Sequence, residues 1–141
     1  MSKFEFEPME PHLRKQLEGL LDGYEWLVPN WCARVAFRVG HDTSSTAFCQ
    51  TRYQYRDCGI QVNPPFWVLG GTDKERIIVH ELVHNFFNPL YLFADDMMDA
   101  TDTDAPHHKV SRKTLEDIND ACTEDMTNAV VEFTRKMYAR N

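Results

Sequence analysis

Positive charge, long apolar runs and closely spaced cysteines are all scarce in this sequence. Its 141 residues hold 15 Lys and Arg against 22 Asp and Glu, which gives a formal net charge of −7. The basic residues form no cluster, and binding to phosphates needs one, so we expect no nucleic-acid partner. No apolar stretch reaches the roughly 20 residues that a membrane-spanning helix needs, so we also expect no membrane partner.

The four cysteines (Cys32, Cys49, Cys58 and Cys122) lie far apart, with no C-x-x-C pair among them. A disulfide framework is therefore not expected, and a reducing compartment is the better interpretation. The first seven residues are acidic and lack the basic-then-apolar layout of a secretory signal. Together these features predict a cytoplasmic protein.

The order of secondary structure predicts a single α+β domain over residues 1–141. Apolar residues recur at helical spacing over residues 11–22, which predicts an N-terminal helix. Residues 31–39 alternate apolar and polar side chains, which predicts a half-buried strand. Two weaker strand patterns follow, over residues 46–55 and 59–62. We expect a small, mainly antiparallel three-stranded sheet, and a length of 141 residues suits one core.

Two helices are expected after the sheet. The first is expected to begin at Thr72, because Thr72 and Glu75 have the spacing of a capping box. It is expected to end or kink next to Pro89. The acidic residues 95–104 then predict a loop, and residues 111–140 predict a C-terminal helix. The loop is long enough to let the chain return to the first of these helices.

One motif carries the chemistry, His80-Glu81-Leu82-Val83-His84. On a helix, His80 and His84 lie on the same face, where two imidazoles can bind one Zn²⁺ at about 2.0–2.1 Å each. Glu81 would then act as the general base that takes a proton from the metal-bound water. In a chain with six His, such a motif arises by chance at a frequency of about 0.02.

The residues around the motif are apolar on nearly every side, which predicts a central, buried helix. They are Ile77, Ile78, Val79, Leu82, Val83, Phe86 and Phe87. Burying two imidazoles and a carboxylate in such a helix is costly unless something compensates them, and a metal at the wall of a cleft does so. The alternative is a pair of core histidines bonded to backbone carbonyls.

The third metal ligand distinguishes one class of zinc protein from another. In one class the motif continues with a glycine and a third histidine, but Phe87 and Leu90 occupy those positions here. In the gluzincins the ligand is a Glu on a later helix, followed four residues on by Asp or Asn. Glu124 and Asn128 have this spacing, and the residues that follow Glu124 are apolar on the opposite face.

Residues 79–84 and 124–133 together resemble a minimal gluzincin. The order of elements also resembles that of small HExxH proteins often encoded by phages and prophages. The resemblance implies a zincin-like fold, with Zn²⁺ held by His80, His84 and Glu124. It also implies that Asn128 supports His80 from the second coordination shell. The implied substrate is a peptide or protein, extended along the sheet edge above the metal.

Other residues compete for some of these roles. His107, His108 and Asp125 are alternatives to Glu124 as the third ligand. A side chain that stabilises the developing oxyanion is also expected, and Tyr91, Tyr138 and the same two histidines are candidates. The sequence does not choose among them.

The sequence therefore predicts a zinc-dependent hydrolase, specifically a metallopeptidase with Glu81 as its general base. The alternative is a regulatory or accessory protein that keeps the zincin-like site and binds a partner peptide without cleaving it. This alternative has some weight because the chain lacks the second lobe that completes the cleft of full-size gluzincins.

Overall fold

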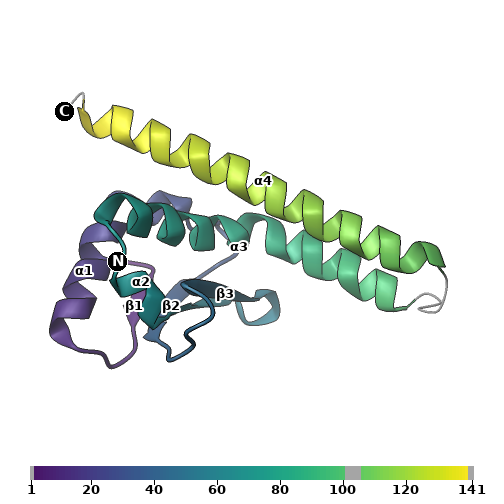
Figure 1. Cartoon of the computed structure of the whole chain (residues 1–141), viewed down its shortest axis with the longest axis horizontal. Coiled ribbons are helices and arrows are strands. Elements are labelled where there is room, and N and C mark those ends of the chain that lie inside the picture. Colours follow the sequence, from purple (N-terminus) through teal and green to yellow (C-terminus); the bar gives the residue numbers. More distant parts are fainter. Residues whose placement is uncertain (1, 101–105, 140–141) are drawn as a thin grey trace.

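The computed structural model describes residues 2–100 and 106–139 (Figure 1). Its strands are β1 (Phe4–Phe6), β2 (Arg34–Val39), β3 (Ala47–Arg52) and β4 (Asp57–Val62). Its α-helices are α1 (Pro11–Leu21), α2 (Pro64–Trp67), α3 (Gly71–Asp99) and α4 (Pro106–Ala139). Two short 3₁₀ helices are η1 (Glu25–Leu27) and η2 (Tyr53–Tyr55). The prediction of a mixture of helices with a small sheet is confirmed.

The sheet has four strands in the order β1-β2-β4-β3, so β3 is an edge strand. β1 pairs with β2 and β2 pairs with β4 in parallel, whereas β3 and β4 are antiparallel. The expected sheet of three mainly antiparallel strands is therefore not what the structure has. β1 is only three residues long, which is too short for an alternating pattern to be recognised. It pairs with β2, although α1 lies between these two strands in the sequence.

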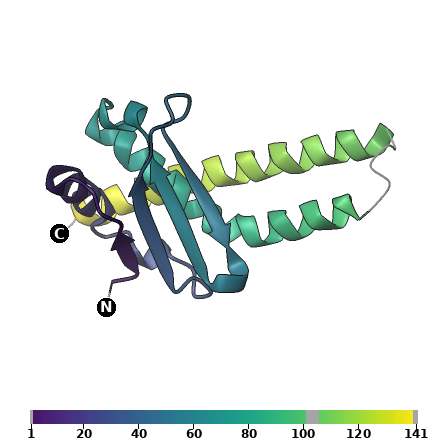
Figure 2. The ribbon, with the colours of Figure 1, turned by 90° about the horizontal axis from the view of Figure 1, so that it is seen from below.

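The two faces of the sheet differ in what covers them. One face carries the fully buried side chains of Val35, Phe37, Ile60 and Val62, and α3 lies across it (Figure 2). These residues pack with apolar residues of α1 and α3 in one core. The alternation predicted for residues 31–39 therefore places the correct side chains inside, although β2 begins three residues later than expected.

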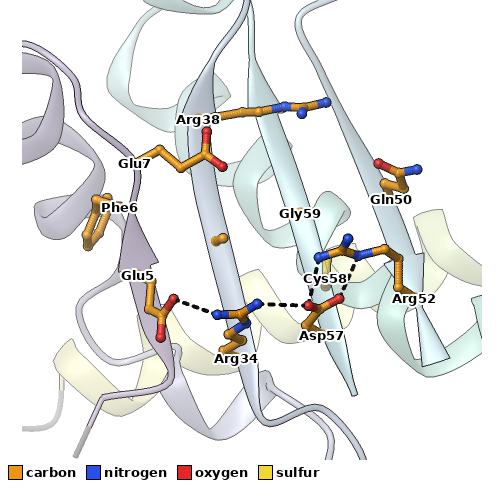
Figure 3. Close-up of a pocket in the computed structure, with 11 residues that line it drawn as sticks. Glu5, Phe6, Glu7, Arg34, Arg38, Gln50, Arg52, Asp57, Cys58 and Gly59 are labelled. Carbon is orange, nitrogen blue, oxygen red and sulfur yellow. Dashed lines mark hydrogen bonds and ion pairs between the residues drawn. The ribbon is translucent and has the colours of Figure 1, made fainter. Parts of the chain in front are cut away.

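The opposite face of the sheet is polar and is crossed by a chain of ion pairs (Figure 3). Arg34 lies 3.6 Å from Glu5 and 3.2 Å from Asp57, and Arg52 lies 2.7 Å from Asp57. Asp57 is buried between the two guanidinium groups, which compensate its charge. These contacts link all four strands, because Glu5 is on β1, Arg34 on β2, Asp57 on β4 and Arg52 on β3. They lie on the side of the sheet away from α3.

α3 and α4 are 29 and 34 residues long and form a hairpin that projects beyond the sheet (Figure 1). α3 begins at Gly71 after the N-cap residue Gly70, with no side-chain cap, so the predicted capping box is wrong. It also runs through Pro89 and does not end there. Proline removes one backbone hydrogen bond, but the packing of α3 against the sheet and α4 offsets this loss.

The acidic segment predicted as a loop is partly helical. Residues up to Asp99 belong to α3, where Asp95 and Asp99 both form ion pairs with Arg112 of α4. Ala100 caps the C-terminal end of α3, and residues 101–104 lie outside the described residues. Within the described part of the chain, no helix combines the length and the apolar character needed to cross a membrane.

Candidate metal centre

α3 brings the three polar residues of the motif together. One ligand atom each from His80, Glu81 and His84 lies within 4.8 Å of the other two. The rings of His80 and His84 are 4.8 Å apart and nearly perpendicular, at 87°. Among the residues that the structure describes, this is the one group of three or more His, Cys, Asp or Glu side chains close enough to hold a metal ion.

The motif is held in place by the core. Ile78, Val79, Leu82 and Val83, which surround the polar residues on α3, are all fully buried. The predicted central helix is therefore confirmed. Since a close-packed core resists displacement, it fixes the positions from which the two histidines and Glu81 project.

Glu81 is a buried carboxyl group, with only 7% of the residue exposed. Burial raises its pKa to about 7, and the backbone N–H of Cys49 on the edge strand β3 donates a hydrogen bond to the carboxylate, which opposes this rise. Near neutral pH the group is therefore poised between the protonated and deprotonated forms. A carboxylate in that range can both accept and return a proton.

The two histidines are neutral at pH 7. Burial lowers the pKa of His84 to about 4, with a further lowering by His80 and an opposing effect of Asp120. Burial also lowers the pKa of His80, again opposed by Asp120. The neutral imidazole is the form that binds metals. In addition, Nδ1 of His84 is buried without a hydrogen-bond partner in the described structure, so this donor set fits a metal ion.

Glu124 of α4 lies against the first histidine. One carboxylate oxygen is 3.2 Å from Nδ1 of His80, and the other accepts a hydrogen bond from Arg76. Asn128, one turn further along α4, is exposed. Glu124 therefore contacts His80 directly, while its role as a metal ligand and the supporting role of Asn128 stay predictions.

The rival histidines lie far from the motif. Nε2 of His108 is 2.7 Å from the backbone carbonyl oxygen of Met98, at the distal end of the hairpin (Figure 1). Met98 is fourteen residues beyond His84 on the same helix, which corresponds to about 21 Å. His107 is exposed beside His108. Neither histidine is placed to bind a metal at His84.

The other candidates are also separated from one another. Tyr138 lies against Gly23, near the C-terminal end of α4. Tyr91 is on α3, two turns beyond His84, where partial burial and nearby acidic groups raise its pKa. Asp125 is exposed on α4. Of these three, Tyr91 is the one on the motif's own helix.

A cavity of about 260 Å³ opens beside the motif. It is lined by Thr46, Arg76, Ile77, His80, Glu81 and Glu124. No motif in the sequence assigned a role to Arg76 or Asp120. Both could have been recognised by helical spacing, since Arg76 is one turn before His80 on α3 and Asp120 is one turn before Glu124 on α4. A second cavity, of about 280 Å³, lies on the polar face of the sheet, away from α3 (Figure 3).

Comparison with known proteins adds no family. No protein-family model matches the sequence, no curated protein matches it, and no solved structure matches the fold. Only the geometry around the motif therefore bears on the function of this chain.

Proposed function

We propose that this protein is a zinc-dependent hydrolase that cleaves peptide bonds. The observation that carries the proposal is the buried Glu81 carboxyl group, placed beside two neutral histidines at the wall of a cavity. A site that used zinc only for folding would have no need of this carboxyl group. The position of the motif helix across the sheet, next to an antiparallel edge strand, supports a zincin-like fold.

Each residue of the motif has a distinct task in such a reaction. His80 and His84 would hold the metal, with a third ligand from the carboxylates of α4 that face this part of α3, Glu124 or Asp120. When bound, Zn²⁺ supplies a Lewis acid that polarises the scissile carbonyl and acidifies a water molecule. Glu81 accepts the proton of the attacking water and passes it to the nitrogen of the leaving amine.

The surroundings of Glu81 suit this task. A general base works best when its pKa is near the working pH, and burial raises that of Glu81 to about 7. The hydrogen bond from Cys49 orients the carboxylate and connects it to β3. Because β3 is the sheet edge, an extended peptide is the substrate class that fits alongside it, with a side chain in the 260 Å³ cavity.

The test compares wild type with Glu81→Gln, using Glu18→Gln on the exposed side of α1 as a matched control. Zinc content and cleavage of a peptide library are measured for each. Glu81→Gln should retain zinc and lose cleavage by about 10²- to 10⁴-fold, the usual contribution of a general base. An active Glu81→Gln variant, or one that loses its zinc, contradicts the assignment. Zinc binding by wild type without any cleavage would favour the accessory protein that binds a partner peptide.

A further inference from the structure

α3 and α4 are antiparallel, and three contacts define which of their residues lie opposite one another. Near the motif, Glu124 contacts His80. Further along the hairpin, Arg112 contacts Asp95. At its distal end, His108 contacts the backbone of Met98. For each residue further along α3, the residue of α4 that lies opposite is therefore about one residue earlier in the sequence.

This register places a residue of α4 opposite the second histidine. His84 is one helical turn after His80 on α3, so its counterpart is one turn before Glu124 on α4. That residue is Asp120.

The orientation of α4 gives the same result. Thr123 and Thr127 are fully buried, which shows that their side of α4 faces the rest of the molecule. Asp120 precedes Thr123 by three residues and Glu124 by four, so it shares this side of the helix. Asp120 is itself exposed, and an exposed carboxylate can change its rotamer at little cost.

Glu124, in contrast, is already engaged by both of its oxygens. One lies at Nδ1 of His80 and the other accepts from Arg76. An imidazole whose Nδ1 is held by a carboxylate presents its other ring nitrogen to a metal, and the carboxylate then orients the ligand without binding the metal itself. Glu124 has the contacts of such a positioning residue.

We infer that Asp120 supplies the third metal-binding carboxylate and that Glu124, held by Arg76, positions His80. This assignment rests on the proposed zinc site and moves both roles one turn towards the N-terminus of α4, compared with the expectation from the sequence. It also gives Arg76 a purpose that no motif assigned. The ligand set becomes two histidines and an aspartate, with the glutamate behind the first histidine.

The experiment measures Zn²⁺ affinity by competition with a chromophoric chelator, using the full chain. Wild type is compared with Asp120→Asn, Glu124→Gln and the exposed neighbour Asp125→Asn. We expect Asp120→Asn to weaken zinc binding by more than 100-fold and Glu124→Gln by about 10- to 100-fold, as is typical of supporting residues. Asp125→Asn should match wild type, and circular dichroism should show that all four proteins are folded.

Several outcomes would overturn the inference. A loss in Glu124→Gln that equals or exceeds the loss in Asp120→Asn would assign the ligand to Glu124. Wild-type affinity in Asp120→Asn would remove Asp120 from the site. In both cases wild type still binds zinc, so the proposed function survives; wild type that binds no zinc refutes both. As an independent readout, the visible spectrum of the Co²⁺-substituted protein should change in Asp120→Asn and persist in Glu124→Gln.

Discussion

The buried carboxyl group of Glu81 should make the metal-free protein less stable as the pH rises. In the folded chain burial raises its pKa to about 7, against an ordinary value of 4.5. The folded state therefore favours the protonated form. The stability that this provides is fully present below pH 4.5 and is lost as the pH rises to about 7. At 1.36 kcal/mol for each unit of pKa, the loss is about 3 kcal/mol.

Glu81→Gln tests this value, because an amide stays neutral at every pH. In chelator, urea unfolding of wild type and Glu81→Gln is measured between pH 4.5 and pH 8. The difference in unfolding free energy should shift by about 3 kcal/mol in favour of Glu81→Gln as the pH rises. The lowered pKa of His84 affects both proteins alike and cancels in the comparison.

A constant difference between the two proteins over this pH range would refute the reasoning. It would mean that Glu81 ionises as readily in the folded chain as in the unfolded chain, and hence is not buried. A shift in the opposite direction would mean that a positive charge faces the carboxylate. Either result would remove the physical basis for a general base with a pKa near 7.

Three further predictions concern the metal and the core. Chelator should lower the melting temperature of the zinc-loaded protein by roughly 5–10 °C, with recovery in excess zinc, and an unchanged melting curve would count against a buried site. Gly23→Ala should lower the unfolding free energy by about 1–2 kcal/mol, since Gly23 has a φ of 83° and a Cβ there would meet the Tyr138 hydroxyl. Gly19→Ala, in open space on α1, should instead raise it by about 0.5–1 kcal/mol; equal effects would contradict this contrast. Leu82→Ala should lower the free energy of urea unfolding by about 2–5 kcal/mol, because Leu82 is fully buried. Leu90→Ala should lower it by less than about 0.5 kcal/mol, because Leu90 is 71% exposed. Similar losses in both variants would show that the core is misplaced.

The motif could be predicted because it is local. His80, Glu81 and His84 are positioned by the geometry of one helix, and the apolar residues around them indicated that this helix is central. Burial of Ile78 and Leu82 agrees with that prediction. The sequence was therefore sufficient to locate the candidate metal centre on α3.

The partners of the motif could not be predicted in the same way. The register between α3 and α4 decides which carboxylate contacts His80. Contacts between residues far apart in sequence determine this register, such as the ion pair of Arg112 and Asp95. Glu124 and Asn128 have the same spacing as Asp120 and Glu124, so a shift of one turn leaves this spacing unchanged. Spacing within one helix carries no information about this shift.

Three expectations about the fold were wrong because tertiary contacts or helix boundaries differ from what local patterns indicate. The strand that begins at Phe4 is recognisable only through its parallel pairing with β2, which lies about thirty residues away. Pro89 was expected to end or kink a helix, but tertiary packing carries α3 through it, as local preferences are readily overridden by contacts. The capping pattern at Thr72 failed because α3 begins one residue earlier, at Gly71.

The most direct test of the central claim is the zinc content of the untagged protein after loading and desalting, measured by atomic absorption. The account predicts one zinc ion per chain in wild type and in His12→Ala, whose imidazole is exposed on α1. It predicts none in the double variant His80→Ala/His84→Ala, which should remain folded enough to be purified for the comparison. Wild type without zinc, or a double variant that retains a full equivalent, would contradict the metal centre proposed on α3.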